Sequence, residues 1–262
     1  MSAPYRRTGA LLSALDIERM DSVVRVTLNR PEKRNAIDPA THAALSEALA
    51  GFDADPSVRM VVLTGAGSAF CAGSDLSVPI VPVPGAERPR LVGPFEAFAK
   101  PIIVAVNGTA AGGGLEIVLC CDIRIASTSA RFVLSEARIG SLPGSGGTQR
   151  LPAAVGPALA AQMIMTAEPI SAERALSAGL VSELCAPEAL IPRAMEIAAA
   201  VAANAPLSIM AAKRALRAAV EGPIKAGLEL ERALFNQLAA TEDRAEGRLA
   251  FRERRAPLFK GR

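Results

Sequence analysis

The sequence predicts an α/β fold that ends in a region of helices alone. Short apolar runs such as Ile102–Val106 have the length of buried strands, and glycine-rich turns follow several of them. After Asn204 such runs stop, and proline, glycine and threonine separate segments with a helical pattern. We therefore expect a mixed strand-and-helix core over residues 1–200 and a helical region over residues 201–262.

The composition is typical of a folded enzyme rather than a disordered chain, with 50% hydrophobic and 21% charged residues. No apolar run reaches the roughly 18–20 residues that cross a bilayer, so we expect no membrane partner. The net charge of +3 does not by itself indicate nucleic-acid binding, and we expect none. We interpret residues 1–15 as a leader into the first strand, with a mitochondrial leader as the alternative.

The four cysteines indicate a reducing compartment. None forms a CxxC pair, and adjacent Cys120 and Cys121 lie inside an apolar segment, as reduced core residues do. We therefore expect a cytoplasmic protein. His42 is the only histidine, so we expect no metal site, and we interpret it as a surface or interface residue.

The first elements follow from alternation, capping and turn residues. Val23–Leu28 alternates as a strand does, and a turn follows it. Asp38 is placed to cap a helix whose first residue is Pro39. Met60–Leu63 is typical of a buried strand. The glycines at 65 and 67 after it lack the third glycine of a dinucleotide fingerprint, so we do not expect NAD binding.

Further along, Phe70–Asp75 is a glycine turn after a strand, able to offer backbone N–H groups to a ligand. The next segment, Leu76–Lys100, is rich in proline, and helix is excluded between Val78 and Pro84. Past residue 120 we expect strands at Asp122–Ala126, Ala130–Val133 and Leu180–Leu184, a turn at Glu136, and a glycine-rich loop at 143–150 that leads into a helix.

The stretch Asn107–Glu116 carries the strongest chemical signal. It joins a buried strand to an apolar helix through three consecutive glycines, which let a ligand approach the backbone closely. The free N–H groups at the start of the helix suit an oxygen that becomes anionic during a reaction. Glu116 lies about one turn beyond Gly113 on the same helical face. We predict an oxyanion site with an acid/base group beside it.

Several of these motifs together resemble the crotonase superfamily, whose best-known members are enoyl-CoA hydratases. The resemblance rests on Phe70–Asp75, Ala105–Gly108 with Gly112–Glu116, Cys121–Ile123 and Gly140–Leu151, in that order along the chain. It implies a spiral of ββα turns with a C-terminal helical trimerisation region. It also implies an acyl-CoA substrate, no cofactor besides the coenzyme A of that substrate, and assembly as a homotrimer or a dimer of trimers.

The resemblance also implies roles for individual residues. The backbone N–H groups of Ser74 and Gly113 would polarise the thioester carbonyl. Glu116 and Glu136 would hold the water that adds at C3, and Glu136 would deliver a proton to C2. The residues that would contact coenzyme A or the acyl chain are Lys33, Arg34, Ala36, Ala72, Asp75, Leu76 and, from a neighbouring subunit, Lys260. The proline-rich segment at 76–100 departs from the family pattern, which leaves the acyl specificity open.

Three alternatives are weighed against hydration. A double-bond isomerase of the same family works with one carboxylate at the Glu136 position, and the presence of Glu116 favours a hydratase. A hydroxycinnamoyl-CoA hydratase-lyase needs a tyrosine, and the only one is Tyr5 in the leader. From a different class, the basic tail Arg244–Arg262 fits a non-catalytic acyl-CoA- or RNA-binding relative, although a solvated face or subunit contact explains it as well.

Overall fold

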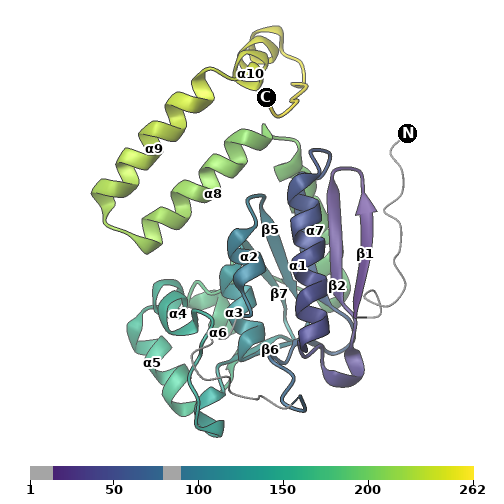
Figure 1. Cartoon of the computed structure of the whole chain (residues 1–262), viewed down its shortest axis with the longest axis vertical. Helices are drawn as coiled ribbons and strands as arrows, with labels where there is room; N and C mark the ends of the chain where they lie inside the picture. Colours follow the sequence, from purple (N-terminus) through teal and green to yellow (C-terminus); the bar gives the residue numbers. More distant parts are fainter. Residues whose placement is uncertain (1–13, 79–89) are drawn as a thin grey trace.

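The computed structural model describes residues 14–78 and 90–262. Within these ranges the strands form two sheets (Figure 1). The larger sheet has the order β1 (Leu15–Met20), β2 (Val23–Leu28), β3 (Met60–Gly65), β5 (Ile102–Val106), β7 (Ile123–Ser127) and β10 (Glu183–Cys185). The smaller sheet has the order β4 (Ala69–Cys71), β6 (Thr109–Ala111), β8 (Arg131–Val133) and β9 (Ile170–Ser171).

The chain alternates between these sheets as it advances. Strands β3, β5 and β7 lie side by side in the larger sheet, and the strand that follows each of them, β4, β6 or β8, lies in the smaller one. All pairings among these six strands are parallel. Helices α3 (Gly113–Cys120) and α4 (Gly147–Val155) follow successive strand pairs. This repeated strand–strand–helix turn confirms the predicted ββα architecture.

The central strands β3 and β5 of the larger sheet are buried on both faces, as their continuous apolar sequences require. One face packs on the main core with α1 (Pro39–Ala54) and α3. The other face packs against α7 (Leu190–Ala202), whose stripe of Leu190, Ala194, Ala198 and Ala202 is apolar and small. Small side chains at every fourth position let this helix lie close to the sheet.

Further helices surround this framework. They are α2 (Gly93–Ala97), α5 (Pro157–Thr166), α6 (Ala172–Ser177) and the short 3₁₀ turns η1 (Pro31–Lys33), η2 (Glu136–Ile139) and η3 (Pro187–Ala189). The chain ends in α8 (Pro206–Glu221), α9 (Ile224–Ala239) and α10 (Glu242–Glu253), and α8 and α9 project as an arm from the sheets (Figure 1).

Two basic side chains of α8 attach this arm to the core. Lys213 is buried, and its Nζ lies 2.9 Å from Asp122 Oδ2 and donates to the Lys100 carbonyl at 2.7 Å. Arg217 donates to the carbonyls of Glu96 and Phe95 at the end of α2. The arm is therefore held by hydrogen-bonded charges rather than by a wide apolar contact.

Several local predictions are confirmed. Asp38 caps α1 by accepting from Thr41 N at 2.7 Å, and Pro39 is the first helical residue. The strand Ile102–Val106 has the predicted bounds, and strands and turns are found at the predicted places near 125, 132 and 136. The exclusion of helix between Val78 and Pro84 falls almost wholly outside the described residues.

The strand predicted at Leu180–Leu184 is present, but it begins three residues later than predicted and ends at Cys185. Leu180 and Val181 are buried core residues, and the strand β10 begins only at Glu183, where the edge of β7 offers Ile125 as a partner. Strands β1, β6 and β9 were not predicted. Each is polar in part or only two or three residues long, and each forms because a neighbouring strand supplies hydrogen-bond partners.

No single helix among the described residues has the length and apolar character to cross a membrane. Only the helical stretches 187–202 and 206–221 pass such a test together, and they meet at an angle of 108°.

Candidate active site

Three adjacent strands of the smaller sheet bring the predicted site residues together. Strands β4, β6 and β8 are parallel neighbours, so their carboxyl ends lie at one edge. Ser74 follows β4, Gly113 follows β6 and Glu136 follows β8. Gly112 N donates to Val133 O at 2.9 Å, which joins the last two of these connections. Residues more than 60 positions apart in the sequence, Ser74 and Glu136, thus reach the same edge.

Two backbone N–H groups converge there. A Cβ placed on Gly113 would lie 3.7 Å from Ser74 N, and one placed on Gly73 would lie 2.9 Å from Gly113 N. Hydrogen bonds from Ile37 N to Gly73 O and from Asp75 N to Ile37 O engage the flanking groups of the turn. Within the described residues neither Ser74 N nor Gly113 N has an acceptor. The pair has the character of an oxyanion hole.

The close approach of these two loops requires glycine. Gly73 has a φ of +87°, and any side chain there would meet Ala111 O and Gly113 N at 2.9 Å. A side chain on Gly114 would lie 2.2 Å from Cys71 O. Two of the glycines around the site therefore serve to bring the donors together, and a larger residue at Gly73 would fill the space in front of Gly113 N.

Glu116 is buried on α3 and is held by the backbone. Its side chain is 4% exposed, and Oε1 accepts from Ser145 N at 2.7 Å and from Gly147 N at 2.9 Å. Within the described residues Glu116 is held by backbone donors, and no arginine forms an ion pair with it. Both N–H donors use Oε1, which leaves Oε2 free of these bonds.

Glu136 lies opposite, in a different environment. Its Oε1 is 3.2 Å from the position that a Cβ on Gly112 would take, and its Oε2 is buried without a hydrogen-bond partner in the described structure. Burial raises the pKa of Glu136, and the charge of Glu116 raises this pKa further. Within the described residues Arg138 pairs with Glu168, and Glu136 forms no ion pair. Two neighbouring carboxyls with different surroundings suit an acid and a base.

The residues expected to contact coenzyme A divide into two groups. Ala72 N donates to Arg34 O at 3.0 Å, so Arg34, Ala36 and Ala72 belong to one surface beside Ser74. Asp75 pairs with Arg30 at 3.2 Å, and the side chain of Leu76 is 66% exposed at the edge of the same turn.

Lys260 lies in the other group. The carbonyl of the neighbouring Phe259 accepts from Arg59 at 2.6 Å, at the amino end of β3, whereas the predicted site lies beyond the carboxyl ends of the strands. Figure 1 shows the end of the chain beside α10. Lys260 N donates to Asp243 Oδ1 at 2.6 Å, which ties this segment to α10. Within one chain the structure does not bring Lys260 to the site.

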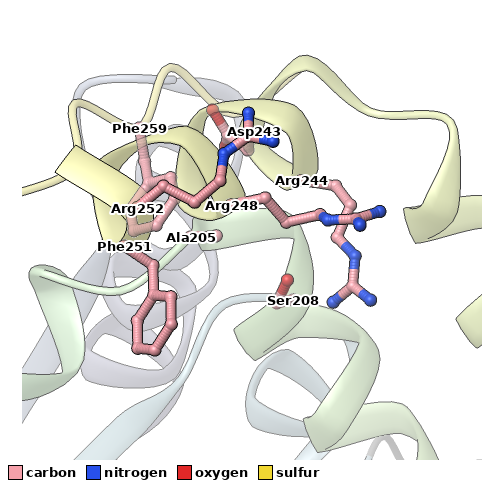
Figure 2. A pocket seen from close by; sticks show the side chains of 9 residues that line it. Ala205, Ser208, Asp243, Arg244, Arg248, Phe251, Arg252 and Phe259 are labelled. Carbon is pink, nitrogen blue, oxygen red and sulfur yellow. The ribbon is translucent and has the colours of Figure 1, made fainter.

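A hollow of about 560 Å³ lies beside this C-terminal segment. Figure 2 shows Arg244, Arg248 and Arg252 around it, with Phe251 and Phe259. The arginines recur at every fourth position of α10 and share one face of it. In the described part of the chain Arg248 and Arg252 form no ion pair, so the hollow carries positive charge.

Sequence reasoning missed two neighbours of the site. The Cδ2 atom of Leu91 lies 2.8 Å from the position of a Cβ on Gly113, and Leu91 N donates to Ser145 Oγ at 3.1 Å. Neither residue stands in a pattern that indicates this contact. Cys71 is fully buried beside the site, and this burial raises the pKa of its thiol to about 12. No group of metal-ligating side chains occurs in the described ranges.

Comparisons with known proteins agree on one family. Residues 18–262 match the family described as enoyl-CoA hydratase/isomerase. The chain is 45% identical to the (E)-benzylidenesuccinyl-CoA hydratase of Thauera aromatica over 94% of its length and 98% of the relative. It is 43% identical to the 2,3-dehydroadipyl-CoA hydratase of Escherichia coli over 96% of its length and 100% of the relative. The crystal structure of an enoyl-CoA hydratase from Bacillus anthracis superimposes with a TM-score of 0.86 at 35% identity, covering 95% of this chain and 100% of that one.

Proposed function

Because the chain belongs to the enoyl-CoA hydratase/isomerase family, we propose that it is a hydro-lyase that adds water across the C2=C3 bond of a 2-enoyl-CoA thioester. The observation that carries the proposal is the placement of Ser74, Gly113 and Glu136 at one sheet edge with Glu116 beside them. The two N–H groups suit the negative charge that forms on the thioester oxygen, and the two carboxyls suit the two proton transfers of the reaction.

The two N–H groups act on the thioester oxygen. Addition of water at C3 moves negative charge onto this oxygen as an enolate forms. Donors that are fixed before the reaction stabilise that charge without reorganising, and one such donor is typically worth about 2.7–4 kcal/mol. The N–H groups of Ser74 and Gly113 have no competing acceptor in the described chain, so both are available to this oxygen.

The two carboxyls divide the proton transfers. Glu116, oriented by Ser145 N and Gly147 N, takes a proton from the attacking water while the water oxygen bonds to C3. Glu136, whose pKa is raised, is suited to hold a proton and to give it to C2. The O–H and C–H bonds of the product then balance the one water consumed. A proton transfer from Glu116 to Glu136 through water restores the starting state.

Glu116 also supports hydration over double-bond isomerisation. Isomerisation moves one proton between two carbons of the substrate, and one carboxyl suffices for it. A second carboxylate, buried and held by two N–H donors, has a use when water must be activated. The proposed hydration needs no cofactor, because the backbone N–H groups polarise the carbonyl and the carboxyls act as acid and base.

Coenzyme A binding and assembly are linked in this proposal. Lys33 and Arg34 supply charge for the phosphates on one side of the site, with Ala36, Ala72, Asp75 and Leu76 along the bound thioester. Lys260 serves the site of a neighbouring subunit, since within its own chain the C-terminal segment is bonded to α10 and to Arg59, away from the site. Large apolar side chains on α8 and α9 are exposed and suit a subunit interface: Leu216, Val220, Ile224, Leu228 and Phe235. A homotrimer or a dimer of trimers accommodates these features.

The cytoplasm is the compartment we propose, because all four cysteines are free and buried. We propose that the basic face of α10 serves the assembly or coenzyme A rather than nucleic acid.

Hydration is tested with a panel of enoyl-CoA thioesters, from crotonyl-CoA to longer chains and 2,3-dehydroadipyl-CoA, monitored by the loss of enoyl absorbance. We expect turnover that depends on acyl length. Gel shifts with RNA at physiological salt are measured in parallel. Negligible turnover of every thioester together with tight RNA binding would replace this proposal by the RNA-binding alternative.

Assembly is tested by light scattering on a size-exclusion column. The wild-type chain should elute with the mass of three or six chains, and Ile224→Glu, which places a charge on the exposed apolar face, should shift it to smaller species. A monomeric wild-type protein would refute the assembly part of the proposal.

A further inference from the structure

Resting on the proposed function, we propose that Leu91 determines specificity against acyl groups branched at C2, and that Ser145 is the positioning residue that holds Leu91 in place. The loop that contains Ser145 would then hold both Leu91, which selects the acyl group, and Glu116. The proposal rests on three sets of contacts around the oxyanion hole.

Leu91 is the apolar neighbour of the oxyanion hole. Its Cδ2 lies 2.8 Å from the position of a Cβ on Gly113, and that position is 3.7 Å from Ser74 N. A thioester oxygen bound by both N–H groups lies about 3 Å from each nitrogen. The acyl C2 is two bonds from that oxygen, so a substituent on C2 comes within the reach of Leu91. A methyl branch there competes with the leucine side chain for space.

Ser145 connects Leu91 to Glu116 through separate atoms. Its hydroxyl accepts from Leu91 N at 3.1 Å, and its own N–H donates to Glu116 Oε1 at 2.7 Å. Ser145 is 8% exposed, so these bonds are shielded from water. The hydroxyl acts on the specificity residue, and the backbone acts on the proposed base. A change of the side chain alone therefore separates the two effects.

An ion pair closes this arrangement from the other side. Arg150 donates to Ser145 O at 3.2 Å and pairs with Glu96 of α2 at 2.6 Å. Glu96 lies five residues beyond Leu91, so the segment from Leu91 to α2 is joined to the loop at both of its ends. The position of Leu91 is thus fixed by the loop on which Glu116 depends, and not by the apolar core alone.

The test is the equilibrium binding of butyryl-CoA and isobutyryl-CoA, measured by titration calorimetry. These saturated thioesters have the same atoms and differ in the branch at C2, and neither can be hydrated. We expect wild type to bind butyryl-CoA at least about ten-fold more tightly, as steric discrimination of one methyl group allows. Leu91→Ala should reduce this ratio to near one, and Leu91→Phe should increase it.

Ser145→Ala keeps both N–H donors to Glu116 and removes only the hydroxyl. It should lower the butyryl/isobutyryl ratio in the same direction as Leu91→Ala, by about three-fold, the effect of one neutral hydrogen bond of roughly 0.65 kcal/mol. The double variant should match Leu91→Ala, because Ser145 acts through Leu91. Ser177→Ala, an exposed serine that bonds within α6, is the matched control and should leave the ratio unchanged.

Equal binding of the two thioesters by wild type, an unchanged ratio in both Leu91 variants, or an unchanged ratio in Ser145→Ala overturns the proposal. Full additivity in the double variant removes the role of Ser145. Hydration of the panel of enoyl-CoA thioesters is measured on the same samples, so that lack of turnover of all of them with intact discrimination in binding refutes the proposed reaction alone. Failure to bind either thioester refutes both proposals.

Discussion

The active-site edge of the smaller sheet and the C-terminal arm are built on opposite principles. At the edge, Gly73, Gly114 and buried Glu116 leave no spare space, and every donor position is set by the backbone. The arm of α8 and α9 is attached by charged side chains and exposes large apolar residues. We therefore propose that the acid, the base and the oxyanion donors come from one chain, whereas the exposed apolar residues of the arm suit a contact with another subunit. Changes at the edge should alter rate, and changes at the arm should alter stability and assembly.

The largest effect is expected at the carboxyls. Glu116→Gln and Glu136→Gln should each lower the kcat of hydration by about 10²–10⁴-fold, the usual contribution of a general acid or base. The dissociation constant of butyryl-CoA should change by less than about three-fold, since neither carboxyl holds coenzyme A. Single-turnover absorbance measures the first quantity and calorimetry the second. Exposed Glu188→Gln is the control, and near-normal turnover in either site variant would remove that residue from the mechanism.

Gly73→Ala tests the oxyanion hole without removing a titratable group. The new methyl would crowd Gly113 N and Ala111 O, and alanine is strained at a φ of +87°. We expect kcat to fall by about 10²–10³-fold, as for the loss of one oxyanion donor. Gly51→Ala is the matched control, because a Cβ there meets nothing within 4 Å in the helix α1. Equal activity of the two variants would argue against the assignment of Ser74 and Gly113.

Lys213→Met tests the attachment of the arm. Lys213 is buried, and its loss leaves Asp122 without its ion-pair partner and the Lys100 carbonyl without its donor. Breaking a buried pair costs about 3–5 kcal/mol, so the free energy of unfolding in urea should fall by about this amount. The kcat of the protein that stays folded should change little. Lys225→Met, which changes an exposed lysine of α9, is the control. A large fall in the kcat of folded Lys213→Met would contradict the separation of the arm from the active-site edge.

The smallest effect concerns pH. The pKa of Glu136 is raised above 4.5 in the folded protein, so the folded state binds its proton more tightly than the unfolded state does. Its contribution to stability is therefore present below pH 4.5 and is lost as pH rises through the raised pKa. Glutamine does not ionise, so Glu136→Gln does not lose stability in this way as pH rises. Thermal unfolding should show the variant gaining on wild type between about pH 4.5 and neutrality, by a few degrees at most. A gain toward acid pH would contradict the assigned direction.

The sequence predicted those parts of the site that local pattern determines. Three glycines before an apolar helix with one acidic residue indicated Gly113 and Glu116, and a cap with Pro39 behind it indicated α1. The meeting of Ser74 with Gly113 required the resemblance, because only the pairing of β4 with β6 places them together. Leu91 and Ser145 were missed, since their contact joins two loops that no repeat or spacing relates.

The short strands show the same limit. β6 and β10 have three residues each, too few to show the alternation of a strand. β10 begins at Glu183, where it can pair with Ile125 of β7, and not where the apolar residues begin. Partner availability, and not intrinsic propensity, decides such elements.

The alternation of the chain between two sheets has a consequence for how the protein folds. Val61 pairs with Ile102 and Ile103 pairs with Ile123, so neither pairing of the central strands can form as a local hairpin. The chain must order a full turn of strand, strand and helix before the hydrogen bonds of the first of these pairings can form. The entropy lost on loop closure opposes each such step. We expect slow folding, with the β1–β2 hairpin as the one sheet contact that can form early. The glycine edge where we place the chemistry is then among the last features to be assembled, because it depends on two such pairings at once.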